Sequence, residues 1–113
     1  MAAKVDLSVE THLVGPGTTT TVVRAEQCEA LAARHIAHVA VVDAAAPYVV
    51  VRTHLSGAFL QACLDGEGKV LLDGRWYPHR PGFASFSPAH VLHAFHCVPR
   101  KGWRVAWVRF MPT

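Results

Sequence analysis

Short apolar stretches separated by turn residues run through the chain from residue 39 onward. Val, Phe, Trp and Tyr are concentrated in these stretches, and Gly, Pro, Asp or Ser separates them at short intervals. Asp73-Gly74 lies between two such stretches and is the strongest hairpin signal in the chain. Many short strands with frequent turns predict an all-β sandwich or barrel. The expected strands cover residues 39–42, 48–54, 58–64, 69–72, 75–78, 83–87, 90–98 and 103–110.

The N-terminal third has a different pattern. Its segment "VGPGTTTTVV" combines a Gly-Pro-Gly break with a Thr-Val run that favours an extended strand. The next segment, "AEQCEALAARH", is rich in helix formers and holds its acidic residues early and its basic residues late. We therefore expect one domain over 1–113, made of an N-terminal arm (1–24), a short helix (25–37) and a barrel (38–113). No DNA-binding domain is expected within this sequence.

Composition and charge narrow the functional classes. The chain has 113 residues, of which 51% are hydrophobic and 17% charged, so it can bury a core and is not predicted to be disordered. The formal net charge of +3 comes from scattered basic residues, which do not form a nucleic-acid footprint. The apolar run at 39–42 is too short to cross a bilayer. Three cysteines without a CxxC pair favour a reducing, cytoplasmic location.

The segment "SPAHVLHAFHC" places three histidines at intervals of three residues. In a helix, His90, His93 and His96 would share one face and could bind a metal together. Pro88 and the flanking strand patterns favour a strand instead, in which alternate side chains point to opposite faces. We therefore expect that the three histidines do not converge. One face would carry His93, Phe95 and Cys97, and the other His90, Leu92, Ala94 and His96.

The same region resembles the second motif of the cupin superfamily. Gly82, Pro88 and His93 match that motif, while Cys97 takes the place of its asparagine. In the first cupin motif only His54 and Gly66 match. There Arg52 replaces a histidine and Phe59 replaces the glutamate.

A more specific resemblance covers roughly residues 45–110 and points to the N-terminal ligand-binding and dimerisation domain of AraC-type transcription regulators. The residues that carry it are Arg52, Gly66, Gly68, Asp73-Gly74, Pro81-Gly82, Pro88, His93, Trp103, Trp107, Val108 and Phe110. The resemblance implies a cupin-type double-stranded β-helix, or jelly-roll barrel, that senses a small molecule, in particular a sugar. It implies a homodimer without catalytic activity. Contact with DNA would be made only through a DNA-binding domain absent from this chain.

The expected ligand-binding residues are Arg52, His54, Gln61, His93 and Trp107. A sugar needs directional hydrogen-bond donors and acceptors together with a flat apolar face. By resemblance, Trp107 corresponds to the tryptophan that packs on the sugar in arabinose-type sensors; plain barrel core is the alternative. Trp103 is expected to pack at the barrel end. Binding is expected to order the arm over the pocket.

No metal and no other cofactor is expected, because Arg52 would repel a cation from the usual cupin metal position. If a metal were bound, His54, His93 and Cys97 are the expected ligands. Two alternatives stay open. One is a stand-alone, metal-dependent cupin enzyme such as an isomerase or dioxygenase, and the other is a filled barrel without a ligand.

Overall fold

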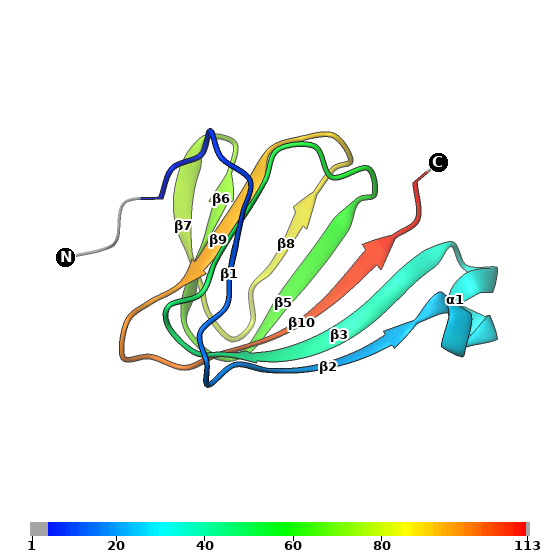
Figure 1. Ribbon diagram of the computed structural model, residues 1–113, viewed down its shortest axis with the longest axis horizontal. Helices are drawn as coiled ribbons and strands as arrows, with labels where there is room; N and C mark the ends of the chain where they lie inside the picture. The colour runs from blue at the N-terminus through cyan, green and yellow to red at the C-terminus, as the bar shows by residue number, and fades with distance from the viewer. Residues whose placement is uncertain (1–4, 113) are drawn as a thin grey trace.

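Two antiparallel five-stranded sheets face each other across a common core (Figure 1). The computed structural model describes residues 5–112. One sheet has the strand order β1-β4-β9-β6-β7 and the other β2-β3-β10-β5-β8, so the predicted all-β class is confirmed. The strands are β1 (Thr11–Leu13), β2 (Thr19–Arg24), β3 (Ile36–Ala44), β4 (Val49–Arg52), β5 (Phe59–Gly66), β6 (Gly68–Leu72), β7 (Arg75–His79), β8 (Ala84–Ser87), β9 (His93–Cys97) and β10 (Trp103–Phe110).

The N-terminal third is more extended than the sequence suggested. The predicted helix over 25–37 is too long: the structure has a 3-10 turn at Ala25–Gln27 and one α-helix, α1, at Glu29–Ala33. His35 has a φ of 58°, which ends the helix, and β3 begins directly afterwards with the β-branched Ile36. The described part of the predicted arm supplies β1 and β2, an edge strand of each sheet; residues 1–4 lie outside the described residues.

The core lies between the sheets and is rich in aromatic rings. Trp103 is 1% exposed, and its ring meets Phe95 and Tyr48 in edge or T-shaped contacts at 5.8 and 6.4 Å. Val105, two residues after Trp103 on β10, is fully buried, whereas Arg104 between Trp103 and Val105 is exposed. This alternation is what a strand with one covered face requires. Each fully buried aliphatic or aromatic side chain contributes roughly 1.5–3 kcal/mol of burial free energy.

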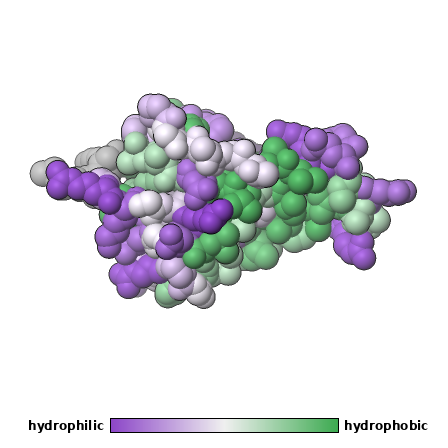
Figure 2. Space-filling model, turned by 90° about the horizontal axis from the view of Figure 1, so that it is seen from below, coloured by the Kyte–Doolittle hydropathy of each residue, from purple (hydrophilic) through white to green (hydrophobic). Residues whose placement is uncertain are grey.

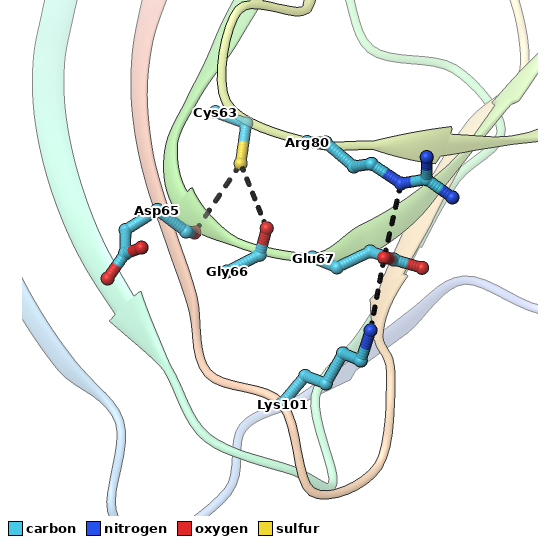
Figure 3. A network of polar contacts seen from close by, with 6 residues as sticks. All are labelled: Cys63, Asp65, Gly66, Glu67, Arg80 and Lys101. Carbon is cyan, nitrogen blue, oxygen red and sulfur yellow. Dashed lines mark hydrogen bonds and ion pairs between the residues drawn. The ribbon is translucent and has the colours of Figure 1, made fainter.

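One end of the barrel is closed by tight turns, and we call it the closed end. It is formed by the β5–β6 and β9–β10 connections around Trp103. A Cβ added to Gly68 would lie only 2.3 Å from the Trp103 ring, so a glycine is needed there. The Glu67 carboxylate, in the β5–β6 connection, pairs with Lys101 of the β9–β10 connection at 3.4 Å and with Arg80 of the β7–β8 connection at 3.2 Å (Figure 3). The Cys63 thiol points to the carbonyl oxygens of Asp65 and Gly66.

The outer face of the β2-β3-β10-β5-β8 sheet is largely apolar, apart from the exposed Arg104–Asp43 ion pair. Figure 2 shows a continuous hydrophobic surface on this side of the molecule. A shallow groove of about 350 Å³ runs along it. The residues that line the groove are Thr21, Val23, Val39, Ala40, Val41, Leu60, Ala62, Ala106, Trp107 and Val108. Among the described residues, no helix has the length and hydropathy that a membrane crossing demands.

Candidate functional site

The end of the barrel opposite Trp103 holds a small cavity, and we call this end the mouth. Here β4 and β10 end while β5 and β9 begin, so four strands bring their terminal residues together. The cavity has a volume of about 30 Å³, which corresponds to about one water molecule. Its lining residues are His38, Arg52, Leu55, Phe59, Phe95, Trp107 and Arg109.

The structure brings together most of the predicted ligand residues. Arg52 and Trp107 both line the cavity. His93 pairs with Arg52 in the β4–β9 register, and its ring stacks on Phe59 with 5.2 Å between the centroids. Gln61 pairs with Trp107 in the β5–β10 register and is 1% exposed.

His54 is the exception among the predicted ligand residues. It follows the end of β4, is exposed, and does not line the cavity. The strand ends at Arg52, two residues before His54, so the alternation that would have turned His54 inward does not reach it. The structure therefore does not join His54 to the other predicted residues.

Several polar atoms are buried beside the cavity without a hydrogen-bond partner within the described chain. They are Nε2 of Gln61, both ring nitrogens of His93 and Nε1 of Trp107. His93 is only 3% exposed. An unpaired buried donor or acceptor costs about 1–3 kcal/mol, so such atoms in a native core call for an explanation. Atoms of this kind near a cavity are what hydrogen bonding to a bound molecule would satisfy.

The mouth carries basic side chains on three of the strands that form it. His38 on β3, Arg52 on β4 and Arg109 on β10 all line the cavity, and none of the lining residues is acidic. Burial lowers the pKa of His38, and the cations of Arg109, Arg24 and Arg52 lower it further, so the ring is mostly neutral at pH 7. Burial and the charge of Arg52 likewise lower the pKa of Arg109. The positive charge of the mouth is therefore that of two partly desolvated guanidinium groups.

The same environment keeps His93 neutral. Burial is the main cause that lowers its pKa to about 4, and the charges of Arg52 and Arg109 add to the effect, while Glu10 opposes it. At neutral pH the His93 ring can therefore donate one hydrogen bond and accept another, but it carries no charge.

Glu10 is the acidic residue nearest to this group. Its carboxylate accepts hydrogen bonds from the backbone N–H and the hydroxyl of Thr53, directly after Arg52. These bonds, first from the hydroxyl and then from the N–H, lower the pKa of Glu10. Within residues 5–112 neither Arg52 nor Arg109 forms an ion pair. The arm thus brings Glu10 to the rim of the mouth, where the charge of Arg52 also lowers its pKa, but the carboxylate pairs with Thr53 rather than with either guanidinium group.

The residues named for a metal do not form a metal site. His93 and Cys97 lie four residues apart on β9, roughly 13 Å along a strand, with the Phe95 ring between them. His54 is exposed outside the strand. No group of three or more His, Cys, Asp or Glu side chains in the described part of the chain could hold a metal ion. The donor set therefore does not fit the metal that many cupins use, and no chemistry is derived through one.

The strand interpretation of "SPAHVLHAFHC" is confirmed from His93 onward. His93, Phe95 and Cys97 are all buried in the barrel, at 3–5% exposure. His96 points to the opposite face, where its ring meets Trp76 at 5.0 Å. His90 lies before the strand, in an exposed turn with a φ of 66°.

Two residues of the mouth were missed by the sequence analysis. Arg109 shares a face with Trp103, Val105 and Trp107, because the four alternate along β10. That alternation along β10 could have predicted that Arg109 faces the barrel interior. No comparable sequence pattern indicates His38, which reaches the cavity because β3 pairs it with Arg109.

A jelly-roll barrel with a polar, aromatic-lined mouth defines a ligand-binding domain of the cupin class. The model of the AraC-like ligand binding domain matches residues 37–113, and the chain belongs to that family. The predicted family resemblance is thereby confirmed. A comparison with curated proteins finds no match.

Solved structures support the fold. The chain is similar to the Cupin_2 domain of an XRE family transcriptional regulator from Enterobacter cloacae, with a TM-score of 0.67, 13% identity, and coverage of 85% of this chain and 98% of that one. It is also similar to a predicted oxalate decarboxylase from Thermotoga maritima (TM-score 0.68, 15% identity, 96% and 99% coverage). An HTH_3 family transcriptional regulator from Vibrio cholerae matches 70% of this chain over 45% of its own length (TM-score 0.58, 16% identity). At these identities the similarity establishes the cupin-like fold alone.

Proposed function

We propose that this chain is the small-molecule sensing and dimerisation domain of an AraC-like transcription regulator, acting in the cytoplasm, and that its ligand is a sugar or sugar derivative. The observation that carries the proposal is the mouth of the barrel. Unpartnered buried donors of Gln61, His93 and Trp107 lie there beside a cavity lined by Phe59 and Trp107. Directional polar groups beside flat apolar rings are what a sugar requires. The scattered basic residues support DNA contact through a separate domain rather than through this barrel.

The volume of the cavity sets a condition on this function. At about 30 Å³ it cannot enclose a monosaccharide, so binding has to open the mouth or place the ligand at its rim. Leu55 lines the cavity and follows directly after the exposed His54. The loop after β4 is therefore the segment that would have to move to open the mouth. Such a step would be a shift between closed and open populations.

The arm is placed to respond to that shift. β1 pairs with β4 through Thr11 and Val51, and Glu10 holds Thr53 at the end of the same strand. A ligand that moves Arg52 or the loop behind it therefore changes the anchorage of the arm. We propose this link as the route from ligand to regulation, and it requires unequal ligand affinity for the two arm states.

The test of the sensing function is a thermal-shift screen of the purified chain against neutral and acidic monosaccharides. A ligand present at 100 times its Kd stabilises the folded state by about 2.7 kcal/mol, which a melting curve resolves readily. Trp107→Ala is expected to abolish the shift, whereas Trp76→Ala, an exposed tryptophan outside the cavity, is the matched control. A shift that survives Trp107→Ala would move the binding site away from the mouth.

The dimerisation part rests on the apolar outer face of the β2-β3-β10-β5-β8 sheet. Five strands about 4.8 Å apart and up to 9 residues long span up to roughly 650 Å². A standard protein interface buries about 800 Å² on each partner. Val23 and Leu60 are 40% and 37% exposed on this face, and contiguous exposed apolar patches of roughly 300–600 Å² often mark contact surfaces. A second copy of the chain is the partner that we propose.

Sedimentation equilibrium tests the dimer. The unmodified chain is expected to dimerise at micromolar concentration, and the double change Val23→Lys and Leu60→Lys is expected to produce a monomer that stays folded. Val91→Lys, an exposed apolar residue in the turn before β9, is the matched control. A monomeric unmodified chain, or a double variant that still dimerises, would remove this part of the proposal.

A metal-dependent enzyme is the alternative, since a predicted oxalate decarboxylase is among the structural neighbours. The separation of His54, His93 and Cys97 gives this alternative no supporting observation in the described chain.

A further inference from the structure

The two arginines at the mouth form no ion pair in the described residues, although Glu10 lies near enough that the charge of Arg52 adds to the hydrogen bonds from Thr53 in lowering its pKa. Arg52 and Arg109 line the same cavity, and no ion pair holds either of them in the described residues. Among the described residues only Arg80, Lys101 and Arg104 form ion pairs, the first two with Glu67 and the third with Asp43. Arg52 and Arg109 differ from the other unpaired basic residues because both line one cavity, and no lining residue of that cavity is acidic.

Holding these charges together costs folding free energy. Like charges close to one another repel, and partial burial removes part of the water that would screen them. His38 lines the same cavity, and burial and the nearby arginine charges help to keep its ring neutral, so the repulsion is between Arg52 and Arg109. A group of this kind lowers stability unless something else in the functional state offsets it. An anion bound between the guanidinium groups would provide that offset.

The residue type indicates which anion. An arginine side chain presents a planar array of N–H donors that matches the two oxygens of a carboxylate or the oxygens of a phosphate. The neutral ring of His93, 3% exposed and unpartnered at both nitrogens, lies beside Arg52 in the register and can add a further hydrogen bond. Phe59 and Trp107 supply an apolar wall next to these donors.

We infer that the ligand of this domain carries an oxyanion group, held between Arg52 and Arg109, with its uncharged part against Phe59 and Trp107. The inference rests on the proposed sensing function and deepens it: the preferred ligand is an acidic sugar or a similar small organic acid, rather than a neutral sugar. A carboxylate and a phosphate share the chemistry that the two arginines recognise.

Isothermal titration of the purified chain with glucose, glucuronate, glucose 1-phosphate and inorganic phosphate tests the inference. Glucose and glucuronate differ only by one carboxylate, so their ratio isolates the contribution of the charge. We expect glucuronate to bind at least tenfold more tightly than glucose, and we expect this preference to shrink when salt is raised from 50 to 500 mM. Tighter binding of glucose 1-phosphate would identify a phosphate as the preferred oxyanion.

Three variants localise the effect. Arg52→Gln and Arg109→Gln are each expected to reduce the affinity for glucuronate at least tenfold more than they reduce the affinity for glucose. Arg104→Gln is the matched control, because Arg104 lies on the same strand but points outward to Asp43 at 3.4 Å with a 54% exposed side chain. Circular dichroism and the melting temperature establish that each variant is folded before it is titrated.

The outcomes separate this inference from the proposed function. Equal affinity for glucose and glucuronate, or a preference that survives Arg52→Gln and Arg109→Gln, would overturn the oxyanion inference and leave the sensor intact. Failure of every anion to bind while a neutral compound from the thermal-shift screen binds would do the same. Failure of all compounds, neutral and acidic, would overturn both.

Discussion

The two ends of the barrel are built from the same strands but obey different physical rules. At the closed end, β10 contributes Trp103, and the neighbouring turns are tied by Glu67 to Arg80 and Lys101. At the mouth, β10 contributes Trp107 and then Arg109, and the charges there are unpaired in the described residues. One end has its charged groups neutralised around a filled core, and the other keeps cations beside a cavity.

The difference separates the part of the fold that provides packing from the part that we propose as the binding site. Trp103 makes ring contacts with His79, Phe95 and Tyr48, so the closed end provides the packing that supports the barrel. The mouth carries the groups that are costly to fold, which is a common property of binding sites. Substitutions at the closed end should therefore lower stability, and substitutions at the mouth should alter binding or its dependence on pH.

The largest expected effect belongs to the closed end. Trp103→Ala is expected to lower the free energy of unfolding by about 4 kcal/mol, because it removes a fully buried ring and leaves a cavity in a close-packed core. Urea denaturation measures the loss. Trp76→Ala, where the side chain is 38% exposed, is the control and should cost less than about 1 kcal/mol. Similar losses in both variants would break the contrast between the two ends.

The second effect is a dependence of stability on pH that originates near the mouth. The unfolded chain binds a proton on His93 near the ordinary pKa of 6.5, whereas the folded chain does so only near 4. Stability is therefore fully present above pH 6.5 and falls as the pH decreases toward 4, by roughly 3 kcal/mol from this residue. Burial also lowers the pKa of His79 and of His38, so both add to the loss in the same direction.

Urea denaturation between pH 4.5 and 7.5 measures this slope. His93→Gln removes the titrating group and is expected to flatten the slope, whatever its effect on stability at neutral pH. His12→Gln, an exposed histidine on β1, is the matched control. An unchanged slope in His93→Gln would show that the mouth does not hold this ring in its neutral form.

The smallest expected effect is a gain in stability when a charge is removed from the mouth. Arg109→Met removes one of the unpaired cations while keeping the apolar part of the side chain, and it is expected to raise stability by up to about 1 kcal/mol. Arg104→Met removes an exposed ion pair on the same strand, so it should change stability by less than about 0.5 kcal/mol, in the destabilising direction. A large loss in Arg109→Met would mean that this arginine supports the barrel rather than a ligand.

The sequence was most informative where local alternation decides the outcome. The alternation of side chains along β9 correctly predicted that His93, Phe95 and Cys97 point into the barrel. It also showed that three histidines at equal spacing need not meet. The burial of Trp103 at the barrel end was predicted and is confirmed. The end of β4 was less predictable, because the strand stops two residues before His54 and leaves that side chain in the solvent.

The sequence by itself determined the all-β class, the inward face of β9 and the family. These features depend on local backbone preferences and on motifs that lie within one segment. Only the tertiary structure decided that His38, Arg52 and Arg109 line one cavity, that Glu10 reaches Thr53, and that the cavity holds about 30 Å³. The physical reason is that these contacts join residues far apart along the chain. Strand register and packing between two sheets set such contacts, and no short window of sequence specifies them.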